Sequence, residues 1–356
     1  MSEKENIQSA QALFDHFNAR NMQAIDAQHA PGHATAFAPG AAGPLNEEQN
    51  WMVLQGFWAA FPNIKLEITL QVAVQFQQHT GPEVRGRLTA VGTTAEPITF
   101  TGRFPDGGPS RGWWDGIWIQ GTAQVPSLGS ELSQATVEYA GYGGGPSAYT
   151  GYGSAGISDS IVREGGSTGI AVGVVGSGTA IIESQVVANA GKGITVVGSY
   201  GLSTRRVSIR GSSIYGNGGL GIDLDDDGVT ANDPGDGDGG TNDGMNLPTL
   251  SATYDGSQTT ISGTLDTASP ASATVDLFTC QTPDPSGQGP GQQMLGWATP
   301  DAGGAFRLTL DGPLPFAFVS ATATNAGGST SEFSATVTVS GGARHLVYLP
   351  LVARNP

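Results

Sequence analysis

The sequence predicts a mainly β protein whose centre is built from stacked repeats, and three observations support this fold class. Residues 135–224 repeat one pattern four times: a short apolar run, a glycine-bearing turn and a second apolar pair. The aligned residues Val137, Ile161, Val186 and Ile214 are separated by 24, 25 and 28 residues, a period typical of repeat proteins. Glycine supplies 55 of the 356 residues and charged residues only 13%, which is typical of turn-rich β proteins.

The repeats read as strands. Their apolar residues are mostly β-branched and alternate with polar ones over four or five positions, as in Ile194 with Val196 and Ile222 with Leu224. A chain that makes a short strand and returns to the same place lays each strand beside its copy in the next coil, so the strands are parallel. Inward Ile and Val side chains then stack, and each stabilises the fold by about 1.5–3 kcal/mol on burial. The sequence therefore predicts a parallel β-helix.

Two asparagines occupy equivalent positions before the turns of successive repeats. Asn189 and Asn217 are 28 residues apart, the same spacing as Val186 and Ile214. Side-chain amides in such positions can hydrogen-bond from one coil to the next. The alternative is that both are ordinary turn residues.

Two stretches before the repeats resemble the opening coils of secreted right-handed β-helix proteins. They are GRLTAVGTTAEPITFTG, residues 86–102, and GWWDGIWIQGTA, residues 112–123. The resemblance implies a right-handed parallel β-helix over residues 72–247, including an acidic exit loop. Trp113, Trp114 and Trp118 are then either core and coil-stacking residues or a sugar-binding platform.

The N-terminal stretch has a different character. Helical apolar spacing in residues 7–20 and 51–61 precedes an alternating strand at residues 64–70. LFDHFNARNMQAIDAQHAPG and FWAAFPNIKLEITL resemble the SnoaL-like cyclases of the NTF2-like superfamily, which implies a partial α+β segment over residues 1–71. An alternative continues the antiparallel sheet of that family through residues 64–120, with Asp115 as the candidate acid.

The exit loop carries eight aspartates between residues 223 and 243. Asp223, Asp225 and Asp227 followed by Gly228 reproduce the D-x-D-x-D-G spacing of calcium loops, although Pro234 stands where the closing Glu would be. We expect a Ca²⁺ site in this loop; its candidate ligands are Asp223, Asp225, Asp227, Asp233, Asp236 and Asp238. The alternative is a solvated acidic loop that covers the end of the solenoid.

From residue 248 the strands become longer and alternate regularly. Six or seven strands over residues 248–340 predict an immunoglobulin-like β-sandwich, although no Cys–Trp–Cys spacing is present. The tail, residues 341–356, contains VYLPLV and resembles the tails that close exported bacterial proteins. The alternative is a last edge strand.

Charge and composition limit the function. The net charge of −16 argues against binding to nucleic acid, and no apolar run reaches the ~18 residues of a membrane span. The lone Cys280 has no partner for an internal disulfide, and MSEKENIQSAQ does not read as a signal peptide. We expect a monomeric, non-catalytic extracellular or cell-envelope protein that is structural or contacts polysaccharides and other cell-surface components.

Two enzymatic alternatives stay open at this point. The first is a SnoaL-like polyketide or ester cyclase acting on a small hydrophobic substrate. The second is a polysaccharide lyase or hydrolase on the β-helix, by resemblance to pectate lyases, which place acidic metal ligands and a basic residue on one face of the coils. Asp159, Glu164 and Glu183 would supply the acids and Arg163 the base.

Overall fold

The structure is a computed structural model that describes residues 73–78, 84–102, 108–121, 126–173, 178–198 and 206–341, with side chains from Leu88 onward. The chain divides into two compact units, Met1–Gln75 and Phe76–Pro356, and nearly all described residues belong to the second. The predicted SnoaL-like segment, residues 1–71, and the tail from residue 342 lie outside the described residues.

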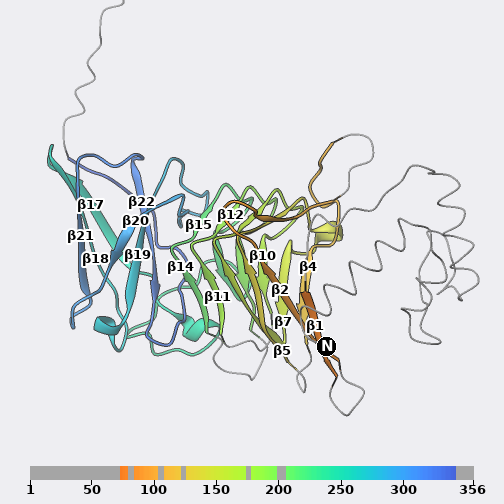
Figure 1. The fold of residues 1–356 in the computed structure, drawn as a ribbon. Helices are drawn as coiled ribbons and strands as arrows, with labels where there is room; N and C mark the ends of the chain where they lie inside the picture. Colours follow the sequence, from red (N-terminus) through yellow and green to blue (C-terminus); the bar gives the residue numbers. More distant parts are fainter. Residues whose placement is uncertain are drawn as a thin grey trace, which may run out of the picture. The chain divides into compact units, whose positions relative to one another are not determined.

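Three sheets whose strands pair in parallel from β2 onward form a β-solenoid, as predicted. From β2 onward each coil gives one strand to each sheet, so successive coils lie side by side (Figure 1), and β1 extends the first sheet alone. The first sheet has the order β1 (Ala73–Gln78), β2 (Val84–Val91), β5 (Ser127–Ser133), β8 (Gly153–Ser158), β11 (Thr179–Ile182), β14 (Val207–Arg210). The second is β3 (Ile98–Phe100), β6 (Ala135–Glu138), β9 (Ile161–Arg163), β12 (Gln185–Val187), β15 (Ser213–Tyr215). The third is β4 (Ile117–Gln120), β7 (Ala148–Gly151), β10 (Ile170–Val172), β13 (Ile194–Val196), β16 (Ile222–Leu224).

Apolar columns fill the interior of the solenoid. In the third sheet Ile170 pairs with Ile194 and Ile194 with Ile222, and all three side chains are buried. Each coil alone could not bury these residues, so the stack forms as one core. The expected column in the second sheet exists, but one member is wrong: Val162 pairs with Val186, and Ile161 lies one position earlier, half-exposed. Because strand side chains alternate between faces, this one-residue shift moves Ile161 out of the core.

Polar columns run beside the apolar ones. Asn189 Nδ2 donates to Asn217 Oδ1 over 3.0 Å, and Asn189 Oδ1 accepts from the backbone N–H of Gly165 at 3.0 Å. The predicted asparagine stacking is therefore confirmed. A serine column follows the same rule: the hydroxyl of Ser184 accepts from Ser160 N at 3.2 Å, and that of Ser212 accepts from Ser184 N at the same distance. These side chains satisfy backbone groups that the coil corners would otherwise leave unpaired.

The coil corners hold residues with left-handed backbone conformation at matching positions. One corner is formed in successive coils by Gln134, Asp159, Glu183 and Gly211, with φ values of 51°, 48°, 50° and 62°. A second corner repeats with Tyr139, Glu164, Ala188 and Gly216, with φ values of 58°, 54°, 55° and 65°. Non-glycine residues adopt this conformation rarely, so its recurrence shows that the coil geometry imposes it.

The alternative antiparallel cone over residues 64–120 does not describe the residues it shares with the solenoid. Strands β2, β3 and β4 each belong to a different sheet and pair in parallel with β5, β6 and β7. Asp115, the acid of that alternative, is exposed on the surface. Strand order, not residue composition, overturns this alternative.

Two antiparallel sheets follow the solenoid, and they share a core that includes Ile261, Leu277 and Val319. One sheet has the order β17 (Thr249–Tyr254), β18 (Gln258–Thr264), β21 (Ala305–Asp311). The other is β20 (Gln293–Ala298), β19 (Thr274–Cys280), β22 (Phe318–Thr324), β23 (Val337–Thr338). Antiparallel β structure in this part of the chain is confirmed, and the immunoglobulin-like topology stays a prediction.

The C-terminal sheets complete the hydrogen bonds of the last coil. Ile214 exchanges two backbone hydrogen bonds with Gly291, of 2.7 and 3.1 Å. Leu224 N donates to Glu332 Oε1 at 2.9 Å, and Ile209 N donates to Thr330 Oγ1 at 2.9 Å. An open solenoid end would present unpaired strand edges to other chains. This end is closed by residues of the same chain.

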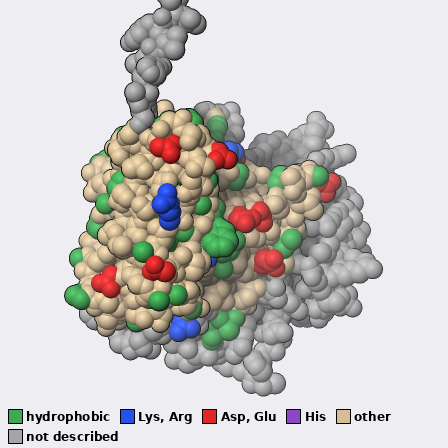
Figure 2. All heavy atoms as spheres, turned by 90° about the vertical axis from the view of Figure 1, so that its left-hand side faces the viewer, with side chains coloured by type: hydrophobic (Ala, Val, Ile, Leu, Met, Phe, Trp, Pro, Cys, Tyr) green, Lys and Arg blue, Asp and Glu red, His purple; other side chains and the backbone are tan. Residues whose placement is uncertain are grey.

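Helical structure within the described ranges is confined to three short 3₁₀ turns, at Tyr142–Gly144, Asn242–Gly244 and Pro270–Ser272. In that part of the chain we find no helix with the length and apolar character needed to span a membrane. On the face shown in Figure 2, acidic and basic side chains are scattered among polar ones, and Lys and Arg do not gather into a patch.

Candidate functional site

The D-x-D-x-D-G aspartates have separate partners. Asp223 lies on β16, is fully buried, and places Oδ2 2.6 Å from Lys192 Nζ. Asp226 Oδ1 is also 2.6 Å from that ammonium. Burial alone would lower the pKa of Lys192, but the hydrogen bonds and charges of the two aspartates outweigh it and raise the pKa. The motif therefore begins with an ion pair that fastens the loop to the solenoid.

The other motif aspartates point elsewhere. Asp225 Oδ1 accepts hydrogen bonds from Thr241 Oγ1 and from Gly198 N, the latter at 2.9 Å. Asp227 is exposed. Among the described residues, Asp223, Asp225 and Asp227 do not form a group whose oxygens could share an ion.

The remaining predicted ligands do come together. Asp233, Asp236 and Asp238 each place a carboxylate oxygen within 4.8 Å of the others. Asp233 Oδ2 accepts from Gly237 N at 3.0 Å and from Asp238 N at 3.2 Å, which folds the loop around this side chain. Its other oxygen, Oδ1, is buried and has no hydrogen-bond partner. A buried carboxylate oxygen without a partner is costly unless a cation or a donor reaches it.

Asn246 is the organising residue that sequence reasoning missed. Its side chain accepts from Asp233 N at 3.0 Å and donates to the carbonyls of Asp233 and Asp266, both at 2.8 Å. Its backbone N–H donates to Asp236 Oδ1 at 2.8 Å. Nothing in the local sequence marks Asn246, because its partners lie 13 and 20 residues away.

The electrostatics of this cluster are unfavourable without a counter-charge. Burial raises the pKa of Asp236, and the charges of Asp233 and Asp238 add to the rise, against hydrogen bonds from Asn246 N and Thr267 Oγ1. Burial also raises the pKa of Asp238, with a further contribution from Asp233. Like charges at this distance disfavour ionisation of one another. The arrangement is chemically suited to a hard cation that takes oxygen ligands.

The residues of the lyase alternative occupy structural positions. Arg163 lies 2.7 Å from Glu138, and Glu164 lies 2.9 Å from Arg111. Asp159 and Glu183 stand at one coil corner and Glu164 at the other. The structure therefore divides these charged side chains between two corners instead of gathering them on one face.

An aromatic pair stands on the outer face of the third sheet. Trp118 on β4 is 50% exposed and pairs in register with Tyr149 on β7. Their ring centroids are 4.7 Å apart, with the planes inclined at 42°. Trp114, in contrast, packs against the solenoid core and donates from Nε1 to Glu138 O at 2.9 Å. Trp114 is therefore a core residue, as one interpretation predicted, and a sugar-binding role for the exposed Trp118 stays a prediction.

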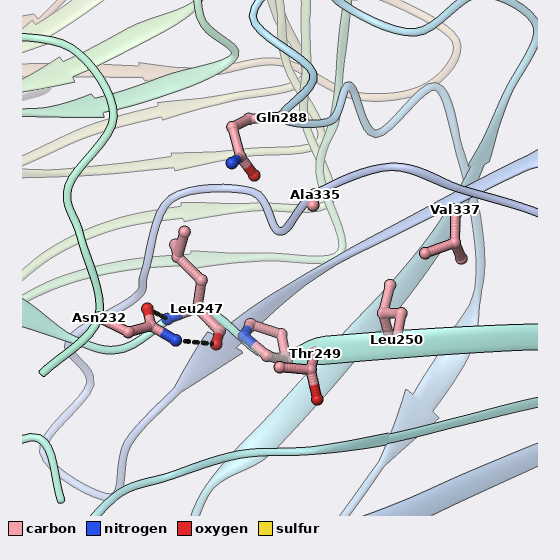
Figure 3. Close-up of a pocket in the computed structure, with 8 residues that line it drawn as sticks. Asn232, Leu247, Thr249, Leu250, Gln288, Ala335 and Val337 are labelled. Atoms are coloured by element: carbon pink, nitrogen blue, oxygen red, sulfur yellow. Dashed lines mark hydrogen bonds between the residues drawn. The ribbon is translucent and has the colours of Figure 1, made fainter. Parts of the chain in front are cut away.

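A cavity of about 300 Å³ lies between the exit segment and the C-terminal sheets. Figure 3 shows Asn232 hydrogen-bonded to the backbone of Leu247 on one side and Leu250 facing Val337 on another. Gln288 Oε1 borders this cavity, is buried and has no hydrogen-bond partner. The cavity thus offers apolar side chains beside one buried, unpaired acceptor, which a water molecule would satisfy.

Neither a protein-family model nor a curated protein matches this sequence.

Proposed function

We propose that this protein is a non-catalytic scaffold that contacts polysaccharides in the cell envelope or outside the cell. The observation that carries the proposal is the outward Trp118 and Tyr149 pair, on a solenoid whose asparagine and serine columns bond coil to coil. Asn189, Asn217 and the serine column hold backbone groups in place instead of facing a substrate. An exposed aromatic pair on a regular sheet face is suited to contacting a polymer.

The charged groups of the solenoid support a binding role over a lyase role. A general base needs reach to its substrate and a pKa suited to proton transfer. The guanidinium of Arg163 makes two hydrogen bonds to Glu138 Oε2, of 3.0 and 2.7 Å, and so serves to join neighbouring coils. The SnoaL-like cyclase alternative rests on residues 1–71, which lie outside the described residues, and on a cone over residues 64–120, whose strands β2, β3 and β4 belong instead to three sheets of the solenoid.

The test is to incubate the full chain with uncharged and anionic polysaccharides while measuring binding and cleavage together. Affinity electrophoresis measures binding, and new reducing ends or unsaturated sugar products measure cleavage. We expect retardation by at least one polysaccharide with no product. Product formation that disappears in Arg163→Ala would replace the scaffold with the lyase, and failure to bind any polysaccharide would end the proposal.

A second function, calcium binding by the exit loop, is favoured by the buried and unpartnered Asp233 Oδ1. Asp233, Asp236 and Asp238 are the residues that would hold the ion. They fit it chemically, because they bring three carboxylates together, no Lys or Arg of the described residues forms an ion pair with them, and the pKa values of Asp236 and Asp238 are raised. Bound Ca²⁺ would supply the missing positive charge. The ion would thereby stiffen the loop that joins the solenoid to the C-terminal sheets.

Isothermal titration of the chelator-treated full chain with Ca²⁺ tests this second function. We expect heat of binding and a higher melting temperature, both lost in Asp233→Asn. Asp227→Asn is the matched control, because Asp227 lies in the same loop but is exposed and does not belong to the cluster. Absence of heat and of a melting shift in the wild-type chain would end the calcium proposal.

A further inference from the structure

We infer that Trp118 and Tyr149 form the contact site for an uncharged polysaccharide, which docks by stacking its sugar rings on the two aromatic faces. The inference deepens the proposed function and rests on it. The site lies on β4 and β7, neighbouring strands at one edge of the third sheet (Figure 1).

The alternation of the two strands directs both rings outward. On β4, Ile117 and Ile119 are buried while Trp118 and Gln120 are exposed. On β7, Ala148 and Thr150 are buried on either side of Tyr149. Since Trp118 and Tyr149 pair directly across the ladder, their rings stand next to each other in successive coils. The solenoid therefore fixes the spacing of the pair.

Glycines give the tyrosine ring room to lie over the sheet. A β-carbon on Gly151 or on Gly173 would collide with the Tyr149 ring and hydroxyl. Gly173 follows β10, so the ring leans from its own coil across the next one. These two glycines thus allow the Tyr149 ring to lie over the sheet.

The chemistry of this surface fits a sugar. The face of an aromatic ring carries negative electrostatic potential and attracts weakly positive C–H groups, which line the flat face of a pyranose. Gln120, exposed two residues after Trp118, offers an amide that can donate to and accept from sugar hydroxyls. Tyr149 adds a hydroxyl beside Gly151, the residue that pairs with Gln120. Stacking and hydrogen-bonding groups therefore adjoin.

Charge selects an uncharged polymer. The chain carries a net charge of −16, and the nearest titratable group along the strand, Asp115, is exposed. The Trp118 indole N–H points to the Asp115 carbonyl at 3.5 Å, which keeps this aspartate beside the platform. An anionic glycan would be repelled at low and moderate ionic strength.

The experiment compares binding of cellohexaose, an uncharged probe, and a galacturonate hexamer, an anionic probe, to the full chain and its variants. Trp118→Ala and Tyr149→Ala should each weaken cellohexaose binding ~10-fold or more, since buried aromatic contacts dominate such interfaces. Tyr149→Phe keeps the ring and should lose much less. Trp297→Ala is the matched control: Trp297 is a comparably exposed tryptophan, at 59%, on β20 of the C-terminal sheets, and its loss should leave binding unchanged.

The outcomes separate this inference from the function beneath it. If the wild-type chain binds a polysaccharide and both alanine variants bind it equally well, the platform is wrong and the polysaccharide binds elsewhere on the chain. If the wild-type chain binds no polysaccharide, the proposed function itself is wrong. If the wild-type chain binds the anionic probe more tightly, the charge argument is wrong. If sedimentation velocity shows a dimer that Trp118→Ala dissociates, the occupant of this face is a second copy of the chain and the inference is overturned.

Discussion

Asn217 Oδ1 lies 3.0 Å from both the backbone nitrogen and the side-chain Nδ2 of Asn189, one coil away. Asn189 is almost fully buried, and its own Oδ1 accepts a hydrogen bond from Gly165 N in the preceding coil. One side chain thus satisfies polar groups of three successive coils. Buried networks of this kind are stabilising only when every member is paired.

Asn189→Ala should therefore destabilise the fold by about 1–3 kcal/mol, the usual cost of leaving buried backbone groups unpaired. A double-mutant cycle with Asn217→Ala, measured by chemical denaturation, gives the part that belongs to the stacking contact. We expect a coupling energy of at least ~0.5 kcal/mol, as found for residues in one hydrogen-bond network. Strict additivity of the two variants would mean that the stacked amides act independently.

The register of the second sheet gives a prediction with an internal control. Val162 is buried in the column with Val186, whereas its neighbour Ile161 is half-exposed. Val162→Ala should cost about 2 kcal/mol, and Ile161→Ala clearly less although it removes more carbon atoms. Equilibrium unfolding of both variants checks the order, and a reversed order would restore the sequence alignment at Ile161.

Ile161 and Val162 also show how much of the solenoid could be predicted from the sequence. The repeat period, the parallel pairing and the columns at Ile194 and Ile222 were predictable, because glycines bracket those strands at constant spacing. The choice between Ile161 and Val162 as the buried residue was not predictable, because both are β-branched and adjacent. The left-handed corner just before this strand is formed by Asp159, and no glycine marks it in the sequence.

The candidate sites divide in the same way. The abundance of aspartate predicted a site in the exit loop, and the D-x-D-x-D-G spacing indicated Asp223, Asp225 and Asp227. In the structure Asp223 pairs with Lys192, Asp225 accepts from Thr241, and Asp227 is exposed. The cluster that does form depends on Asn246, a long-range contact. Asp233, Asp236 and Asp238 belonged to the predicted ligand set, but no spacing motif distinguished them from the other aspartates of the loop.

The ion pair between Arg210 of the last coil and Asp276 of the C-terminal sheets gives a third prediction. Arg210 donates to both carboxylate oxygens, at 2.7 and 2.9 Å, and Asp276 is 1% exposed. Arg210→Met leaves a buried carboxylate without its counter-ion and should cost about 3–5 kcal/mol. The double variant Arg210→Met with Asp276→Asn should be more stable than Arg210→Met alone.

Arg163→Met is the comparison for this measurement. Its partner Glu138 forms an ion pair of the same 2.7 Å length, but the arginine side chain is 46% exposed. Exposed pairs contribute roughly 0–1 kcal/mol, so this variant should unfold close to the wild type. If Arg210→Met and Arg163→Met lose equal free energy of unfolding, the burial of Asp276 does not explain the contribution of its ion pair.

The pH dependence of stability offers a test of the acidic cluster that needs no ligand. The pKa of Asp236 is raised above its ordinary 3.8 in the folded chain, chiefly by burial. Between 3.8 and that raised value the folded chain binds more protons at this site than the unfolded chain does. The stability that Asp236 contributes is therefore greatest below its ordinary pKa, falls as the pH rises through this window, and is constant above it.

Calorimetric melting of Asp236→Asn in a chelator should show a smaller loss of stability with rising pH than the wild type shows. Asp255→Asn is the matched control, because hydrogen bonds from the Gln258 and Ser257 backbone lower the pKa of Asp255, so its contribution is lost as the pH falls. The two variants should depart from the wild type in opposite directions across the acidic range. Ca²⁺ is then added to both chains. If it removes their difference in stability only at pH values above the raised pKa of Asp236, the ion relieves repulsion among ionised carboxylates.

If the difference in stability does not depend on pH, Asp236 is an ordinary hydrogen-bonded loop residue.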